Sequence, residues 1–217
     1  MMIIRPKGPK AKMSLCSVSR GGIGLGHGVV QQARWKVNDR IEVGWVQKAT
    51  CIVLRQANGG GEGFLLGYSD ARHKTGGKIQ CKAFIQNYLQ TLIDLPKHGL
   101  EPVFFKDGKW SVALLLETLG WVSHAFSKTD ANRIPPTAVG VYELLGKGDA
   151  VLRIGEGKIR ERIDAHLKDI RFAPPTVKSI RYLDLDSSED SQLIEKMLIA
   201  KYEAETGILP RFQEIRA

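Results

Sequence analysis

The chain has 217 residues, of which 43% are hydrophobic, so it is long and apolar enough for one large domain or two small ones with buried cores. Its formal charge of +9 and pI near 9.5 favour a polyanionic partner, which for a soluble protein is usually nucleic acid. No apolar run is long enough to span a membrane, and residues 1–12 lack the apolar segment of a signal peptide. The absence of a Walker motif argues against a nucleotide cofactor.

The cysteines Cys16, Cys51 and Cys81 are odd in number, widely spaced and each set in an apolar run. We therefore expect reduced core residues rather than a metal site or a disulfide framework, which favours the cytoplasm. Residues 1–13 form a short basic arm that contains Arg5, Lys7, Lys10 and Lys12. Two interpretations of this arm stay open: a frayed tail, and an arm that follows the phosphates of a nucleic acid.

Residues 14–116 are rich in predicted strands. Strands are expected over 15–19, in the second half of 36–46 and over 51–56, with a short helix over 29–35. The glycines at 22, 24, 26 and 28 do not have the spacing of a dinucleotide-binding loop, and no long helix follows them. We expect them to permit tight turns of the backbone.

The segments SVSRGGIGL (17–25), WKVNDRIEV (35–43) and CIVLR (51–55) carry a first resemblance. Their order of strand, short helix, Asn-Asp turn and hairpin resembles the AbrB-type swapped-hairpin fold. That resemblance implies a β-rich barrel that binds double-stranded DNA and needs a second copy of the unit to close. The basic residues that we expect to contact DNA are Arg20, Arg34, Lys36, Lys78 and Lys82.

A second copy of this unit is predicted within the same chain. Residues 76–116 again show a Gly-Gly lead, a strand, a helix and a hairpin, as residues 14–66 do. Gly21-Gly22 would correspond to Gly76-Gly77, and Val29-Val30-Gln31 to Phe84-Ile85-Gln86. An internal duplication is one interpretation, and the chance similarity of any two hairpin units is the other. Residues 117–136 are expected to be a linker, because Pro135-Pro136 can continue neither a helix nor an interior strand.

Residues 137–217 predict a compact α/β unit. Gly140-Val141-Tyr142 opens a hairpin whose return strand carries Arg153-Ile154-Gly155. In the helix that follows, Arg162 and His166 lie one turn apart and therefore project from the same side. A strand is expected over 179–185, then an N-cap in SSED (187–190) and a second helix that carries Glu195.

This pattern resembles a GIY-YIG nuclease domain. The resemblance implies a small sheet flanked by helices and hydrolysis of DNA phosphodiesters with one divalent metal ion, Mg²⁺ or Mn²⁺. It implies catalytic roles for a set of five residues, of which the glutamate would hold the metal: Tyr142, Arg153, Arg162, His166 and Glu195. The chain departs from the family pattern at Arg153, where a second tyrosine is usual, and at Gln213, where asparagine is usual. Arg160 is the less favoured alternative to Arg162.

The chemistry needs these residue types. Hydrolysis requires an activated water and neutralisation of the charge that develops on the phosphoryl oxygens. A single carboxylate such as Glu195 is enough to anchor Mg²⁺, which keeps most of its waters, and the planar guanidinium of Arg162 suits a phosphate. Tyr142 would pass on the proton of the water, either as a phenolate or through His166. Arg153 or the metal would have to lower the pKa of the tyrosine from about 10.

The sequence thus predicts an α+β protein with a β-rich DNA-binding module and a nuclease module. The expected function is a sequence-specific, metal-dependent DNA endonuclease of the type II restriction kind, with repair and mobile-element nucleases built from the same parts. Two alternatives stay open: a DNA-binding regulator whose nuclease fold has lost catalysis, and an enzyme that acts on RNA. The recognition sequence, the cleavage stagger and the oligomeric state do not follow from the sequence.

Overall fold

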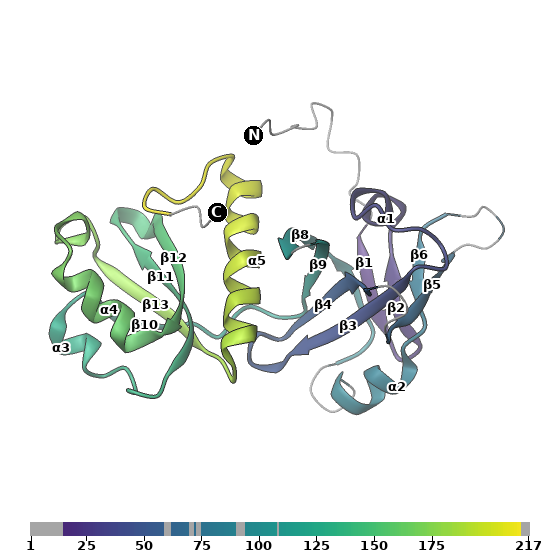
Figure 1. Cartoon of the computed structure of the whole chain (residues 1–217), viewed down its shortest axis with the longest axis horizontal. Helices are drawn as coiled ribbons and strands as arrows, with labels where there is room; N and C mark the ends of the chain where they lie inside the picture. The colour runs from purple at the N-terminus through teal and green to yellow at the C-terminus, as the bar shows by residue number, and fades with distance from the viewer. Residues whose placement is uncertain are drawn as a thin grey trace. The chain divides into compact units, whose positions relative to one another are not determined.

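The computed structural model describes residues 15–58, 62–69, 72, 75–89, 94–107 and 109–213 (Figure 1). The predicted basic arm over 1–13 lies outside these residues. Contacts within the chain divide it into two compact units. The first unit comprises Met1–Val43 and Leu54–Pro102, and the second comprises Gly44–Val53 and Val103–Ala217. Strands and helices both contribute, so the α+β class is confirmed.

The strands before residue 116 form one nine-stranded sheet. Its hydrogen-bonded order is β7-β1-β2-β6-β5-β3-β4-β9-β8. The strands are β1 (Cys16–Ser19), β2 (Gly22–Leu25), β3 (Arg40–Val46), β4 (Cys51–Gln56), β5 (Phe64–Gly67), β6 (Gly77–Ile79), β7 (Lys97–Leu100), β8 (Pro102–Asp107) and β9 (Lys109–Leu115). The edge strands β7 and β8 are separated in the chain by Glu101 alone. The helical segments are α1 (His27–Gln32) and α2 (Lys82–Phe84), the latter continued by a π-helical turn, Ile85–Leu89.

The order of elements repeats within this sheet. A strand pair, a short helix and two further strands occur as β1-β2-α1-β3-β4. A similar order follows as β5-β6-α2-β7-β8-β9, with β7 as an additional strand. β2 and β6 pair with each other at Ile23 and Ile79, and are flanked by β1 and β5. Ile23, Leu25, Val29 and Ala33 are buried, and so are the residues 56 positions later, Ile79, Cys81, Ile85 and Leu89. The duplication stays a prediction, because this second order begins at β5 (Phe64–Gly67), before the predicted second copy over 76–116, and contains the additional strand β7.

We expected the glycines at 22 and 24 to permit turns. They instead lie within β2, between β1 and β6. Gly22 has a φ of +147°, and a Cβ placed on it would strike the backbone carbonyl of Ile79. A Cβ on Gly24 would lie 2.6 Å from the Ser17 hydroxyl oxygen. The absence of side chains therefore lets neighbouring strands and their side chains approach closely.

The second unit is built on a four-stranded antiparallel sheet with the order β10-β13-β11-β12. Its strands are β10 (Val122–Ala125), β11 (Val139–Leu145), β12 (Val151–Lys158) and β13 (Ser179–Asp184). Its helices are α3 (Lys128–Ala131), α4 (Ile159–Lys168) and α5 (Ser188–Thr206). The stretch 117–136, expected to be a linker, instead supplies β10 and α3, and Phe126, Ala131 and Ile134 are buried. Its apolar side chains explain why it joins the sheet.

Residues of β11 alternate between the two faces of this sheet. Tyr142 and Leu144 belong to a core that α4 covers, together with Ile159, Ile163 and Phe172. Val141 points the other way, into a core that α5 covers with Ile194, Met197 and Leu198. The two helices thus lie on opposite faces of the sheet (Figure 1).

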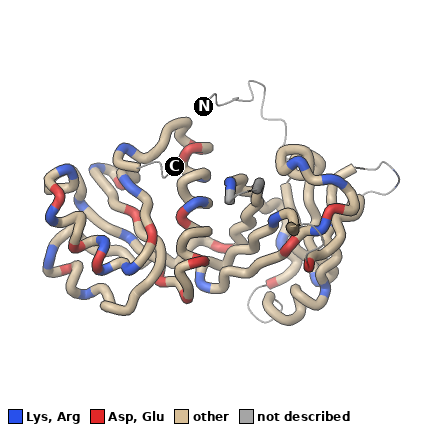
Figure 2. The backbone as a smooth tube through the Cα atoms, viewed as in Figure 1, with Lys and Arg blue, Asp and Glu red and all other residues tan. Residues whose placement is uncertain are grey.

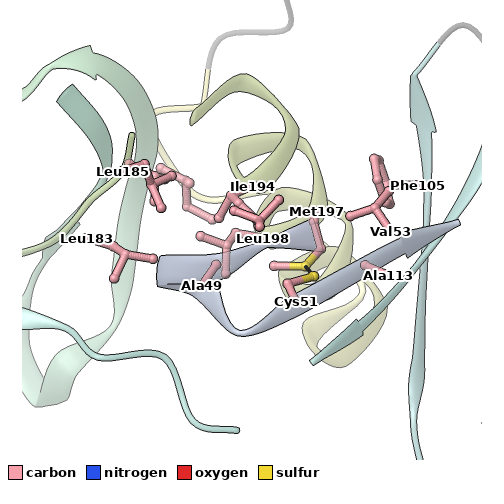
Figure 3. Packing of buried hydrophobic residues seen from close by; sticks show 13 residues of the cluster. Ala49, Cys51, Val53, Phe105, Ala113, Leu183, Leu185, Ile194, Met197 and Leu198 are labelled. Carbon is pink, nitrogen blue, oxygen red and sulfur yellow. Dashed lines mark hydrogen bonds between the residues drawn. The ribbon is translucent and has the colours of Figure 1, made fainter. Parts of the chain in front are cut away.

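The core under α5 also contains residues from segments before residue 116. Ala49, Cys51, Phe105 and Ala113 pack with α5, and the Cys51 Sγ lies 4.0 Å from the Met197 Sδ (Figure 3). The expected boundary near residue 116 therefore cuts through a continuous core. A fragment that ended near Asn132 would expose these side chains, so DNA binding by the N-terminal half has to be measured in the full chain.

Several local expectations are confirmed. The Ser187 hydroxyl accepts a hydrogen bond from the Asp190 amide at 3.0 Å, so Ser187 is the N-cap of α5. Cys16, Cys51 and Cys81 are buried free thiols, and burial raises the pKa of Cys51 to about 12, which keeps it protonated. Among the described residues, no helix has both the length and the apolar character needed to cross a bilayer.

Gly140 provides a direct test of strand packing. A Cβ at this position would strike the backbone carbonyl of Leu183 on β13, whereas a Cβ on Gly120 meets nothing within 4 Å. We expect Gly140→Ala to lower the free energy of unfolding by about 1–3 kcal/mol because β11 and β13 must separate. Gly120→Ala is the matched control and should change it by less than about 0.5 kcal/mol. If urea unfolded both variants at the same midpoint concentration, the sheet would have accommodated the Cβ of residue 140 without a loss of stability.

Candidate active site

The β11–β12 hairpin places Tyr142 opposite Gly155, and both lie on the α4 face of the sheet. A Cβ on Gly155 would collide with the Tyr142 hydroxyl, so only glycine leaves room for the ring. Gly157 has a φ of +121°, and a Cβ there would lie 3.2 Å from the Arg162 Nε. These two glycines therefore allow the tyrosine and the arginine to lie close against β12.

Tyr142 and His166 form the centre of the site. The Tyr142 hydroxyl oxygen lies 2.7 Å from the His166 Nε2, although the residues come from different elements, β11 and α4. Tyr142 is buried and His166 half-buried. The edge of the Phe172 ring packs against the His166 ring with centroids 4.6 Å apart, which holds the imidazole in place. The predicted pairing of a tyrosine with a histidine one turn beyond the arginine is thus present in the structure.

Arg153 points into the unit rather than to solvent. It is half-buried, and its Nη1 donates to the Phe212 carbonyl at 2.8 Å. Its side chain also hydrogen-bonds Tyr142, and its charge acts on both Tyr142 and His166. The arginine that replaces the expected second tyrosine therefore belongs to the same cluster and also fastens the C-terminal segment.

Gln213, the second departure from the expected pattern, has a structural role. Its Oε1 accepts the Ile154 amide at 3.0 Å, and the Phe212 amide donates to the Leu152 carbonyl at 2.8 Å. Because β12 is an edge strand, these bonds cover backbone groups that would otherwise be open. Gln213 therefore holds the C-terminal segment against the open edge of β12.

Arg162 and Arg160 have different surroundings. The Arg162 Nε donates to the Glu156 carbonyl at 3.2 Å, and its charge acts on both Tyr142 and His166. Arg160 turns away from this pair, and its Nη2 donates to the Asn132 Oδ1 at 3.0 Å. Beside the site is a depression of about 370 Å³ lined by Lys158, Glu161, Arg162 and Ala165. Arg162 is therefore the arginine placed to meet an anion from solvent.

The protonation states follow from burial and from the two arginines. Burial raises the pKa of Tyr142, while Arg153 and then Arg162 oppose that rise. Burial and the Arg153 charge lower the pKa of His166 to about 4, so the imidazole is neutral at pH 7. A neutral imidazole has one acceptor nitrogen. We assign this role to Nε2, which then accepts the Tyr142 hydroxyl proton.

Glu195 joins the site through its charge. It is half-buried on α5, and its carboxylate raises the pKa of Tyr142. Within the described ranges there is no group of three or more His, Cys, Asp or Glu side chains suited to a metal ion. A single carboxylate still fits Mg²⁺ or Mn²⁺ if water completes the coordination. Glu195 is the residue that would hold such an ion.

The five basic residues expected to contact DNA are all exposed, and all belong to the first unit. Arg20 lies between β1 and β2, Arg34 and Lys36 follow α1, Lys78 lies in β6, and Lys82 begins α2. Their exposure leaves them accessible to phosphates. Figure 2 shows Lys and Arg residues around α3 and α4 in the second unit, with Asp and Glu residues between them.

Sequence reasoning missed Phe172, whose ring packs edge to face with the Phe212 ring, with centroids 5.1 Å apart. No spacing in the sequence marks Phe172, because its ring meets those of His166 and Phe212 only in the folded unit. Glu143 follows Tyr142 in the chain and is also buried, but strand alternation turns it to the other face. There it pairs with Arg181 at 2.6 Å, and so it is not a second acid for the site.

Comparison of the chain with protein-family models, curated proteins and solved structures finds no match. What the site can do is judged from its own groups. The Tyr142 hydroxyl contacts a neutral imidazole, two guanidinium charges act on both groups, and a carboxylate acts on the same hydroxyl. This set can move a proton, stabilise an anionic transition state and hold a hard cation, which are the requirements of phosphodiester hydrolysis.

Proposed function

We propose that this protein is a metal-dependent DNA endonuclease of the GIY-YIG type that acts as a sequence-specific, type II-like restriction enzyme. The observation that carries the proposal is the 2.7 Å contact between the Tyr142 hydroxyl and the His166 Nε2, with Arg153 and Arg162 beside both groups. A buried tyrosine joined to a neutral histidine is a proton-transfer pair, and two cations beside it suit a phosphate.

Tyr142 and His166 would activate the attacking water. Tyr142 takes a proton from the water as its own proton passes to the His166 Nε2, so the hydroxyl need not ionise in the resting enzyme. This route suits a tyrosine whose pKa is raised by burial, because the resting phenolate would be rare at neutral pH. Arg153 favours the transfer by stabilising negative charge on the tyrosine oxygen.

Arg162 would bind the scissile phosphate from the depression beside α4 and stabilise the charge that develops on its oxygens. Glu195 would hold one Mg²⁺ or Mn²⁺ ion. The ion, when bound, supplies Lewis acidity and helps the leaving alkoxide. The exposed basic residues of the first unit would bind duplex DNA, as its likeness to swapped-hairpin barrels suggests, and so supply the affinity that a cutting unit needs.

The test is incubation of the full-length protein with mixed-sequence plasmid DNA and Mg²⁺ or Mn²⁺, followed by mapping of the ends. Defined fragments are expected, with 5′ and 3′ ends that recur at one sequence. Binding without cleavage under every metal condition would favour the alternative, a DNA-binding regulator with a decayed nuclease fold. Cleavage of RNA but not of DNA in a parallel reaction would show that the substrate class is wrong.

Arg153 provides a prediction on pH dependence. Removal of its charge raises the pKa of Tyr142 further and also raises the pKa of His166, because Arg153 lowers both. Both changes move the active range to higher pH, because the tyrosine loses its proton at higher pH and the histidine becomes neutral, and so able to accept a proton, at higher pH. We expect Arg153→Tyr to retain measurable cleavage with its pH optimum shifted upward.

Arg153→Ala should lose more activity than Arg153→Tyr, because it removes the charge and also the bond to the Phe212 carbonyl. Rates of cleavage between pH 6 and 10 check the prediction, with thermal unfolding measured in parallel to separate a loss of fold. An unchanged pH profile for Arg153→Ala would remove Arg153 from the proton-transfer chemistry.

A further inference from the structure

The segment that follows α5 is fastened along the edge strand β12. The Phe212 amide donates to the Leu152 carbonyl at 2.8 Å, and the Phe212 carbonyl accepts from the Arg153 Nη1 at 2.8 Å. The Gln213 Oε1 accepts the Ile154 amide at 3.0 Å. Because these hydrogen bonds engage three consecutive residues of β12, the backbone of Phe212 has a fixed position on the sheet.

From this backbone, the Phe212 ring reaches the centre of the proposed site through one further ring. It packs edge to face against the Phe172 ring, with centroids 5.1 Å apart and an interplanar angle of 72°. The Phe172 ring packs in the same manner against the His166 ring, with centroids 4.6 Å apart and an angle of 64°. The His166 Nε2 in turn lies 2.7 Å from the Tyr142 hydroxyl oxygen. A series of contacts therefore runs from Phe212 to the proton-transfer pair.

The contact between His166 and Tyr142 depends on the orientation of the imidazole. Rotation of the ring about its χ2 torsion moves Nε2 away from the hydroxyl, and torsions of this kind have broad preferences, so neighbours must hold the ring. Edge-to-face pairs of rings prefer a defined relative orientation, so Phe172 restricts the imidazole. The Phe172 ring, which is fully buried, is restricted in the same way by Phe212.

We propose that Phe212 is a positioning residue for the proton-transfer pair: its ring, acting through that of Phe172, holds the His166 imidazole in line with the tyrosine hydroxyl. The inference rests on the proposed nuclease function. Phe212 is anchored on β12 beside Arg153, so the strand that carries this arginine also sets the orientation of the histidine. The two groups that act on the tyrosine are thereby held in register.

Phe212 has no charge, so it acts through the position and the burial of the imidazole. The titratable and charged groups that act on His166 come from β11, β12, α4 and the turn after α4, and they include Tyr142, Arg153, Arg162, Asp169 and Arg171. Burial is the largest cause that lowers the pKa of His166 to about 4. An imidazole that turned toward water would therefore regain part of its ordinary pKa.

The test compares Phe212→Leu with Phe212→Tyr, which keeps the ring, and with Phe126→Leu. Phe126 is the matched control because it is a phenylalanine of the same core but directly follows β10. The ¹⁵N chemical shifts of the His166 imidazole, assigned with a His166→Gln variant, report the protonated nitrogen and the pKa in the full-length protein. Cleavage rates with Mg²⁺ are measured as a function of pH, and unfolding temperatures are measured in parallel.

Wild type, Phe212→Tyr and Phe126→Leu should show one tautomer, in which Nδ1 carries the proton and Nε2 accepts. Phe212→Leu should show a mixture of tautomers and a pKa of His166 raised by about one unit, because water reaches the imidazole. Its cleavage should be slower on the order of tenfold, since the pair is no longer aligned. The acidic limb of its pH profile should move upward with the pKa of His166.

A single tautomer with the wild-type pKa in Phe212→Leu would overturn the inference. A mixture in Phe126→Leu as well would also overturn it, because any loosening of the core would then be sufficient. A Phe212→Tyr variant as impaired as Phe212→Leu would show that the aromatic ring does not hold the histidine. A wild-type protein that cuts no DNA would overturn the proposed function, and the ¹⁵N shifts would still decide whether Phe212 positions His166.

Discussion

Glu195→Gln is expected to abolish DNA cleavage while DNA binding survives. Glu195 is the carboxylate whose charge reaches Tyr142, and the amide that replaces it is a poor ligand for Mg²⁺. The loss of one negative charge near phosphate should leave affinity equal or slightly higher. Initial cleavage rates over a range of Mg²⁺ and Mn²⁺ concentrations, with binding measured in the same buffers, check both parts.

Glu189→Gln is the control for this experiment. It makes the same chemical change on the same helix, but Glu189 is exposed in the first turn of α5. It should cleave at the wild-type rate, and both variants should unfold at similar temperatures. If Glu195→Gln cut DNA at the wild-type rate, Glu195 would not be the metal ligand.

Arg162→Ala should lower the cleavage rate about a hundredfold, because loss of a phosphate-facing guanidinium in a preorganised site costs on the order of 3 kcal/mol of transition-state stabilisation. The ground-state affinity for DNA should change much less, since many other cations contribute to it. Single-turnover rates with enzyme in excess separate the chemical step from binding. Arg162→Lys should recover only part of the rate, because an ammonium group lacks the planar pair of donors.

Arg160→Ala is the matched control on the same helix. Its guanidinium bonds to Asn132 rather than facing the depression beside Arg162, so we expect a much smaller effect on the rate. A greater loss for Arg160→Ala than for Arg162→Ala would show that the wrong arginine has been placed at the phosphate. Similar large losses for both would instead indicate that α4 as a whole had shifted.

Much of the candidate site was predictable because its signals are local. The apolar spacing of Ile159 and Ile163 set the inward face of α4, and this alone placed Arg162 and His166 on a common side. The Ser187 cap marked the start of α5 within one residue. Strand alternation put Tyr142 on one face of β11 and Glu143 on the other, although only the partners show which face is functional.

The expected domain boundaries were less accurate because they depend on contacts that are distant in sequence. The polar character of 117–136 and its two prolines indicated a linker, yet β10 pairs with β13, which begins more than fifty residues later. Cys51 packs against Met197 for a similar reason: burial of apolar surface does not follow the order of the chain. A pattern within a window of residues carries no information on such partners.

The sequence by itself determined the class of fold, the hairpin and helix that carry Tyr142, Arg162 and His166, and the buried state of the cysteines, because each depends on periodicity and composition. Tertiary structure alone decided the rest. In the folded unit, Arg153 points inward and donates to the Phe212 carbonyl, and Gln213 accepts the Ile154 amide. Both hydrogen bonds join β12 to the C-terminal segment, which is distant in sequence. It also set the protonation of Tyr142 and His166, because a pKa depends on burial and on charges brought near in space.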